Sequence, residues 1–213
     1  MVIAIDGPAG AGKSTVARRL AGALGFTYLD SGAMYRCVAL AALRRGVGPD
    51  DADAAGTLAA QIEIRLDGDR VELDGEDVTE EIRTPAVSAA ASRVSVHPAV
   101  REAIVERQRA LIAAGRYVAE GRDIGTVVSP DAPLKVFLTA NADERARRRA
   151  TDTGEPLEAV LSAQAARDAR DRERQHAPLR PADDAVQIDT TDREVADVVD
   201  EIAGLARERG LAG

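Results

Sequence analysis

Short apolar runs alternate along this chain with longer segments whose apolar residues recur at helical spacing. Wholly apolar runs of a few residues are typical of buried parallel strands, and spacings of three and four residues are typical of amphipathic helices. The pattern predicts strands at residues 2–5, 26–29, 117–119, 134–138 and 185–188. It predicts helices at about residues 14–24, 32–45, 49–60, 99–114, 142–150, 156–174 and 193–209. Strands that alternate with helices favour an α/β fold with a parallel sheet.

One segment departs from this rhythm. Between about residues 60 and 84, apolar and polar residues alternate, and Asp-Gly turns fall at Asp67-Gly68 and Asp74-Gly75. Period-two alternation that is broken by such turns predicts an antiparallel meander. We therefore expect a small antiparallel β insert within the α/β chain.

The first strand runs directly into the sequence Gly7-Pro8-Ala9-Gly10-Ala11-Gly12-Lys13-Ser14, and a helix follows. This is the phosphate-binding loop pattern in the strand–helix context that gives it meaning. Glycines let the backbone wrap a phosphate, and the amides of the helix N-terminus donate to it. Lys13 supplies a mobile charge for the β- and γ-phosphates, and the Ser14 hydroxyl can bind Mg²⁺. The motif predicts a nucleoside-triphosphate site without choosing between a switch, a motor and a kinase.

Composition adds constraints. The 213 residues carry a net charge of −8, which disfavours diffuse binding to nucleic acid or to anionic membranes. One cysteine excludes an internal disulfide and disfavours a zinc site, and we find no signal peptide or apolar run that could span a membrane. These features predict a cytoplasmic protein. Only Lys13 and Lys135 are lysines, so a lysine in the phosphate loop stands out.

Polar clusters follow the second and third predicted strands, at the sheet edge where α/β proteins bind ligands. Asp30, Ser31 and Arg36 follow the second strand, where an ordinary helix N-cap is an equal alternative. Glu120-Gly121-Arg122-Asp123 follows the third, and could hold an anionic acceptor or form a surface ion pair. Arg101 lies near a helix N-terminus, where a cation opposes the helix dipole, so binding and plain surface roles both stay open.

Residues 167–174 are dense in charge. On a helix, Arg167, Arg170, Asp171 and Arg174 share one face, with three cations around one carboxylate. A solvated face with ion pairs is the alternative. A break expected at residues 175–178 favours a mobile, arginine-bearing lid, because phosphoryl transfer needs cations and the exclusion of water.

These blocks together resemble the bacterial cytidylate kinase family, nucleoside-monophosphate kinases of the P-loop superfamily. The resemblance rests on residues 5–15, 29–36, 121–128, 130–133, 167–174 and 177–179, and it covers essentially the whole chain in order. It implies one P-loop kinase domain over residues 1–213, with a five-stranded parallel sheet of order 2-3-1-4-5 flanked by helices. Residues 1–30 and 115–213 are the implied core, residues 31–114 the monophosphate-binding region with the insert at 60–84, and residues 154–180 the lid region.

By the same resemblance, the reaction is phosphoryl transfer from ATP with Mg²⁺ to CMP or dCMP, by a monomer. Lys13, Arg122, Asp123, Arg167 and Arg174 are the implied catalytic residues. ATP is assigned to Gly7, Pro8, Ala9, Gly10, Ala11, Gly12, Lys13, Ser14, Thr15 and Arg170, although Arg170 could equally form a salt bridge. CMP is assigned to Asp30, Ser31, Arg36, Ser92, Arg101, Arg122, Asp123, Arg167, Asp171 and Arg174. Arg122 is expected near the acceptor phosphate and Asp123 near its sugar.

Two other functions compete with this one. A different small-acceptor P-loop kinase shares most of these features, and a regulatory switch shares the phosphate loop but has no use for a stripe of lid arginines. We interpret Cys37 as a core residue, His97 as structural and Lys135 as lying at the edge or end of its strand. A catalytic role for His176 is disfavoured, since phosphoryl transfer needs little general-base help.

Overall fold

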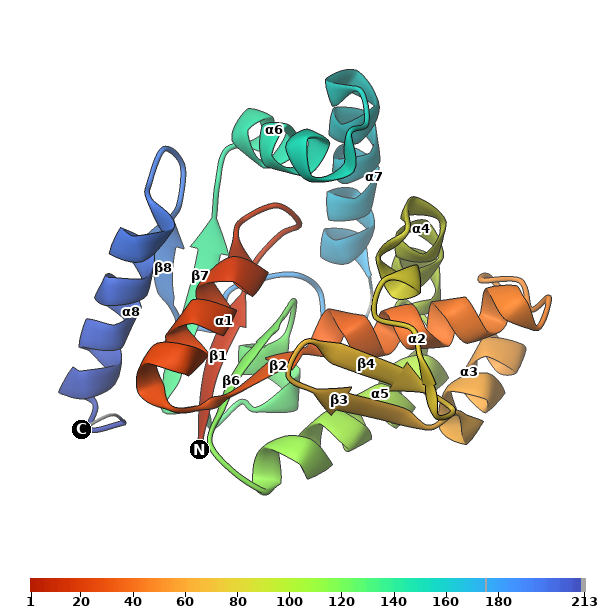
Figure 1. Cartoon of the computed structure of the whole chain (residues 1–213), viewed down its shortest axis with the longest axis horizontal. Coiled ribbons are helices and arrows are strands. Elements are labelled where there is room, and N and C mark those ends of the chain that lie inside the picture. The colour runs from red at the N-terminus through yellow and green to blue at the C-terminus, as the bar shows by residue number, and fades with distance from the viewer. Residues whose placement is uncertain (175, 212–213) are drawn as a thin grey trace. The chain divides into compact units, whose positions relative to one another are not determined.

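A computed structural model gives the fold, and it describes residues 1–174 and 176–211 (Figure 1). The chain forms two compact units. One combines Met1–Tyr28 with Gly115–Gly213, and the other is Leu29–Ala114. We call them the phosphate-loop unit and the inserted unit.

The sheet of the fold confirms the expected architecture. Its five strands are β1 (Val2–Asp6), β2 (Thr27–Asp30), β6 (Tyr117–Gly121), β7 (Leu134–Thr139) and β8 (Val186–Asp189). They lie in the order β2-β6-β1-β7-β8, which is 2-3-1-4-5 when only these five strands are counted. β1 pairs in parallel with both β6 and β7, so Ile3 lies opposite Val118 on one side and Leu134 on the other. All five residues of β1 are buried, which explains its unbroken apolar run up to Asp6.

Within the described residues, the phosphate-loop unit contains four α-helices, α1 (Lys13–Leu24), α6 (Ala142–Thr153), α7 (Leu157–Glu173) and α8 (Val195–Glu208), and a short π-helix at Ile124–Val128. α1 packs on α8 and on β6, whereas α6 packs on α7 (Figure 1). Ile3, Leu20 and Ile202 are fully buried in the core between sheet and helices. Full burial of one such side chain contributes about 1.5–3 kcal/mol.

The inserted unit contains the helices α2 (Ser31–Arg44), α3 (Ala52–Gln61), α4 (Pro85–Val94) and α5 (Pro98–Ala113). α2 packs on α4, and α3 packs on α5. The predicted meander is confirmed as the antiparallel strands β3 (Ile64–Asp67), β4 (Arg70–Leu73) and β5 (Glu76–Asp77), followed by a short 3₁₀ turn at Glu81–Arg83.

Helix α4 is absent from the sequence prediction. Its buried residues include Val87, Ala90, Ala91 and Val94, which have the spacing of one helix face, and Pro85 occupies its first turn. The signal was therefore present, but it is carried mostly by alanines, whose small side chains mark a buried face weakly. No helix in the described part of the chain is long and apolar enough to cross a membrane.

Candidate functional site

At Gly7 and Gly10, the loop between β1 and α1 has a backbone that only glycine fits. A Cβ atom on Gly7 would lie 2.1 Å from the carbonyl oxygen of Leu138 in β7, and φ of Gly7 is +149°. Gly10 has φ of +77°, and a Cβ there would meet the backbone and Cβ of Arg145 at 2.9 Å. The loop is thus pressed against β7 on one side and α6 on the other, and α1 begins immediately after it at Lys13.

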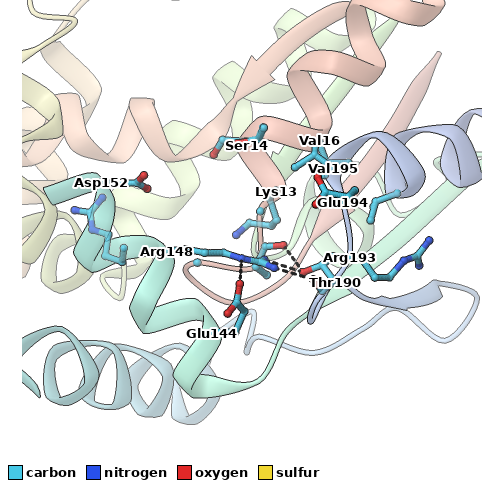
Figure 2. Close-up of a pocket in the computed structure, with 16 residues that line it drawn as sticks. Lys13, Ser14, Val16, Glu144, Arg148, Asp152, Thr190, Arg193, Glu194 and Val195 are labelled. Carbon is cyan, nitrogen blue, oxygen red and sulfur yellow. Dashed lines mark hydrogen bonds and ion pairs between the residues drawn. The ribbon is translucent and has the colours of Figure 1, made fainter. Parts of the chain in front are cut away.

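A pocket of about 480 Å³ opens at the N-terminus of α1. Figure 2 shows Lys13, Ser14 and Arg148 around it, with side chains from the phosphate loop, α6 and the segment after β8. Its lining residues are Gly10, Ala11, Gly12, Lys13, Ser14, Thr15, Val16, Glu144, Arg148, Arg149, Asp152, Thr190, Arg193, Glu194, Val195 and Val198. The structure therefore places most of the predicted triphosphate-binding loop on one cavity.

Lys13 is buried, and its ammonium donates a hydrogen bond of 2.8 Å to the carbonyl of Pro8. The pKa of Lys13 falls to about 7, mainly because of burial and in part because of the neighbouring charges of Arg122 and Arg167. Two predicted cations therefore stand close enough to the phosphate-loop lysine to repel its charge. A site with several converging cations is suited to a polyanion.

Three arginines of the pocket were missed from the sequence: Arg148, Arg149 and Arg193. Arg148 donates to the Glu144 carboxylate at 2.9 Å and to the Thr190 carbonyl at 2.8 Å, as the dashed lines of Figure 2 show. Both α6 and Thr190 follow the carboxyl ends of sheet strands, β7 and β8. The same edge argument that selected Arg122 could have found them.

Asp6, the last residue of β1, anchors the segment that follows β6. Its two carboxylate oxygens accept backbone hydrogen bonds from Ile124 at 2.8 Å and Gly125 at 2.7 Å. Burial raises the pKa of Asp6 to about 6 despite these bonds. Asp6 thereby fixes the backbone next to Asp123, which is one of the predicted catalytic and CMP-binding residues.

Glu120 is buried at the end of β6, and one of its carboxylate oxygens accepts a 2.7 Å hydrogen bond from the Tyr28 hydroxyl. This contact ties β2 to β6 at the edge where the polar cluster begins. Lys135 lies near the start of β7 with its side chain 9% exposed, and it forms an ion pair of 2.9 Å with Asp184.

The predicted group of three cations around Asp171 exists, but with a different member. Arg122 donates from Nε to Asp171 Oδ2 at 3.0 Å. Burial raises the pKa of Asp171, but the charges of Arg122, Arg167 and Arg174 outweigh it and lower the pKa below its usual value. Arg170, the expected third cation, is exposed. Helical spacing relates only residues of the same helix, so it does not predict that the end of β6 brings Arg122 to α7.

Arg174 also departs from the expected helical stripe. The helix α7 ends at Glu173, and Arg174 has extended backbone with φ of −60° and ψ of 135°. Its side chain turns back, so that Nη2 lies 3.9 Å from Asp123 Oδ1 and Nε donates to the carbonyl of Ala177. Of the break predicted at residues 175–178, Gln175 lies outside the described residues. His176 is exposed.

In the inserted unit, Asp30 acts as the N-cap of α2, the structural alternative named above. Its Oδ1 accepts from the backbone of Ala33 at 2.9 Å, and its Oδ2 forms a 2.6 Å ion pair with Arg36. The neighbouring Ser31 is buried. One carboxylate therefore caps the helix and also positions the Arg36 guanidinium.

Arg101, in α5, is buried, and its guanidinium carbon lies 5.9 Å from the centre of the Tyr35 ring in α2. Ser92 is buried in α4, which packs on the same helix. The inserted unit therefore gathers its predicted acceptor residues on and around α2.

Cys37 is fully buried in α2, and burial raises the pKa of its thiol to about 12. His97 is the N-cap residue of α5, and its ring Nε2 lies 2.8 Å from the Pro49 carbonyl oxygen.

The residues present fit a magnesium ion that is held mainly by phosphates and water. The described residues contain no group of three or more histidine, cysteine or acidic side chains that could enclose a metal ion. Ser14 is an exposed hydroxyl on the pocket, next to Lys13. At a triphosphate site the protein commonly supplies a hydroxyl ligand to Mg²⁺, and phosphate oxygens and water supply most of the others.

A glycine loop between a central parallel strand and a helix, with cations gathered around its lysine, defines a P-loop nucleoside-triphosphate-binding protein. Comparison with known proteins narrows this class. The family model "Cytidylate kinase" matches residues 3–208, so the chain belongs to the cytidylate kinase family.

Two curated relatives support this membership over nearly the whole chain. A protein named cytidylate kinase from Mycobacterium avium is 52% identical and covers 98% of this chain and 96% of its own. One of the same name from Geobacter sulfurreducens is 49% identical and covers 100% and 95%. A solved structure of an uncharacterized protein from Eubacterium ventriosum shares the fold, with a TM-score of 0.58, 16% identity and 98% coverage of both chains.

Proposed function

We propose that this chain is a Mg²⁺-dependent kinase that transfers the γ-phosphoryl group of ATP to CMP or dCMP. Membership of the cytidylate kinase family supports both the co-substrate and the acceptor. The observation that carries the proposal is the gathering of Arg122, Arg167 and Arg174 at Asp171, with the first two also close to Lys13. A regulatory switch needs no such cluster, whereas phosphoryl transfer requires cations around the transferred group.

The donor nucleotide is assigned to the phosphate-loop pocket. The amides of residues 7–15 face the phosphates, and the Lys13 ammonium exchanges the Pro8 carbonyl for the β- and γ-phosphates. Ser14 would hold Mg²⁺, which would neutralise phosphate charge. Arg148 and Arg193 extend the pocket beyond the phosphates. Arg170, which is exposed on α7, is also assigned to ATP.

The acceptor monophosphate is assigned to the residues that the family resemblance implies for it. Arg122 binds its phosphate, and Asp123 contacts its sugar. Arg167, Asp171 and Arg174 complete this set in the phosphate-loop unit, whereas the inserted unit contributes Asp30, Ser31, Arg36, Ser92 and Arg101. Each arginine presents a planar fork that can bind a phosphate through two hydrogen bonds.

In the reaction, an acceptor phosphate oxygen attacks the γ-phosphorus of ATP, and the bond from that phosphorus to the β,γ-bridging oxygen breaks. Four cations neutralise charge on the transferred phosphoryl group, on ADP and on the acceptor phosphate: Lys13, Arg122, Arg167 and Arg174. The residues act by positioning and by electrostatic stabilisation, so the chemistry needs no histidine.

A coupled assay of ADP formation tests the proposal with CMP, dCMP, UMP, AMP and shikimate as acceptors. CMP and dCMP should be turned over most efficiently. A preference for another acceptor favours the rival small-acceptor kinase. Slow hydrolysis that no acceptor accelerates favours a switch and overturns the proposal.

A further inference from the structure

Arg145 joins three segments that lie far apart in the sequence. Its Nη1 donates to the carbonyl of Ala9 in the phosphate loop at 2.9 Å, and its Nε donates to the carbonyl of Ala140 before α6 at 3.1 Å. Its Nη2 forms a 2.8 Å ion pair with Asp168 Oδ2 in α7. The two side chains are only 7% and 6% exposed. All three guanidinium nitrogens are therefore engaged, each with a different segment.

The backbone around Arg145 adds to this junction. Gly10 lies so close to Arg145 that a Cβ atom on Gly10 would stand 2.9 Å from the Arg145 carbonyl oxygen. That carbonyl oxygen also accepts a 3.2 Å hydrogen bond from the Gln164 side chain of α7. The phosphate loop thus contacts α6 at the residue to which α7 is bound.

Stability alone gives a poor reason for a carboxylate at Asp168. Within the described part of the chain, Asp168 Oδ1 is buried and has no hydrogen-bond partner. A buried ion pair whose acceptor is half satisfied is often no more stable than apolar packing. Its geometry, by contrast, is specific, since only a charged fork can hold Ala9, Ala140 and Asp168 at once.

Asp168 lies one helical turn before Asp171, and both are buried in α7. Asp171 receives the Arg122 hydrogen bond at 3.0 Å. Helix α7 is therefore fixed at two successive positions, once to the phosphate loop through Arg145 and once to the end of β6 through Arg122. Arg167 stands directly before the first of these positions.

We propose that Arg145 and Asp168 are positioning residues that hold α7 to the phosphate loop, so that Arg167 and Arg174 stay in register with Lys13. This inference deepens the proposed function and rests on it. Neither residue contacts the transferred group. They determine where the arginines of α7 lie when the phosphates are bound. A displacement of these arginines by about 1 Å can lower the rate about 100-fold.

The test uses Asp168→Asn, which keeps the shape of the side chain and removes its charge. We expect kcat to fall about 10- to 100-fold, whereas KM for ATP changes by less than about 3-fold, because the ATP contacts themselves remain. In an Arg167→Ala background, Asp168→Asn should lower kcat much less, because the cation that Asp168 positions is absent. Full activity of Asp168→Asn, or a loss unchanged by Arg167→Ala, overturns the proposal.

Glu158→Gln is the matched control, because it makes the same acid-to-amide change at an exposed position of α7. Amide hydrogen exchange supplies a readout that needs no turnover. Peptides that contain Ala9 and Gly10 should exchange faster in Asp168→Asn, but not in Glu158→Gln. Unchanged exchange in the phosphate loop overturns the proposal.

If Asp168→Asn fails to fold, Arg145→Lys serves instead, and the same results are expected. A lysine keeps the charge but has one nitrogen in place of the three that contact Ala9, Ala140 and Asp168. If wild-type protein phosphorylates no acceptor, the proposed function falls, and the exchange rates alone decide whether Asp168 holds the loop.

Discussion

Arg122 and Asp171 are 49 positions apart in the chain, and the guanidinium Nε of one lies 3.0 Å from the carboxylate Oδ2 of the other. The pair connects the end of β6 to helix α7. It also holds the fork of Arg122 in place, because the charge-assisted bond restricts the rotation of the side chain. An incoming phosphate therefore meets an arginine that is already oriented, which lowers the entropy cost of binding.

Arg122→Ala should weaken acceptor binding far more than ATP binding. Loss of a charged hydrogen-bond partner costs about 1.5–3 kcal/mol, so KM for CMP should rise about 10- to 100-fold. KM for ATP should change by less than about 3-fold, since the phosphate-loop contacts remain. Steady-state kinetics with each substrate varied in turn provide the measurement.

Arg147→Ala is the control for this substitution, because Arg147 is in α6 with its side chain 67% exposed. It should leave both KM values unchanged. Equal losses for CMP and ATP in Arg122→Ala would contradict the assignment of Arg122 to the acceptor.

The raised pKa of Asp6 makes stability depend on pH. With a pKa of about 6, Asp6 keeps a proton in the folded protein that it has already lost in the unfolded chain, where its pKa has the ordinary value of 3.8. Its stabilising effect is therefore complete below about pH 4 and is lost as the pH rises through about 6. Asp6→Asn removes this dependence, and relative to wild type it should gain roughly 2 kcal/mol between pH 4 and pH 7.

Urea unfolding of both proteins at several pH values tests this expectation. The amide also disturbs the bonds to Ile124 and Gly125, but that cost is the same at every pH. The prediction is that the difference in unfolding free energy between the two proteins changes with pH. If the two curves of unfolding free energy against pH were parallel, they would contradict it.

Gly10→Ala should be much more damaging than Gly25→Ala, although both glycines have positive φ, at +77° and +65°. A Cβ on Gly10 meets Arg145 at 2.9 Å, whereas a Cβ on Gly25 meets nothing within 4 Å. The backbone term alone costs about 1 kcal/mol, and overpacking adds about 1–3 kcal/mol. Urea unfolding and calorimetric titration with ATP measure both effects.

ATP affinity should also separate the two variants, since Gly10 lines the pocket and Gly25 ends α1. An equal fall of unfolding free energy in both would show that the contact with Arg145 yields easily, and would weaken the case for a rigid junction there.

Cys37 should resist alkylation in the native protein. Burial raises the pKa of its thiol to about 12, so almost no thiolate exists near pH 8. Iodoacetamide should modify the native protein negligibly over hours and the urea-unfolded protein to one equivalent, as judged by mass spectrometry. Because it is the sole cysteine, its modification of the native state would contradict the core packing directly.

Local patterns predict the elements of the fold well, and long-range contacts account for what they miss. The strand at residues 2–5 and the glycine loop after it are encoded within a dozen residues, so both the sheet and the phosphate site follow from periodicity and motif. The order of the strands came from the family resemblance, because an apolar run predicts a strand but not the strands that pair with it. Helix α4 was missed because alanines carry its buried face.

The candidate site shows the same division. Arg167 and Asp171 were grouped correctly because helical spacing places them together. Arg122 joins them across 49 positions, and Arg145 reaches Ala9 across 136. No local pattern specifies such pairings, which depend on how the helices pack at the edge of the sheet.

The division of the chain into an inserted unit and a phosphate-loop unit sets an order for synthesis. Residues 29–114 are continuous, so this unit can complete its own contacts as soon as it has left the ribosome. β1 must wait, because both its partners come later: Ile3 pairs with Val118 and Leu134. The apolar strand β1 and the glycine loop therefore emerge before the inserted unit, but β1 is paired only after that unit has been made. During that interval this segment is the part of the nascent chain most exposed to aggregation and to chaperones.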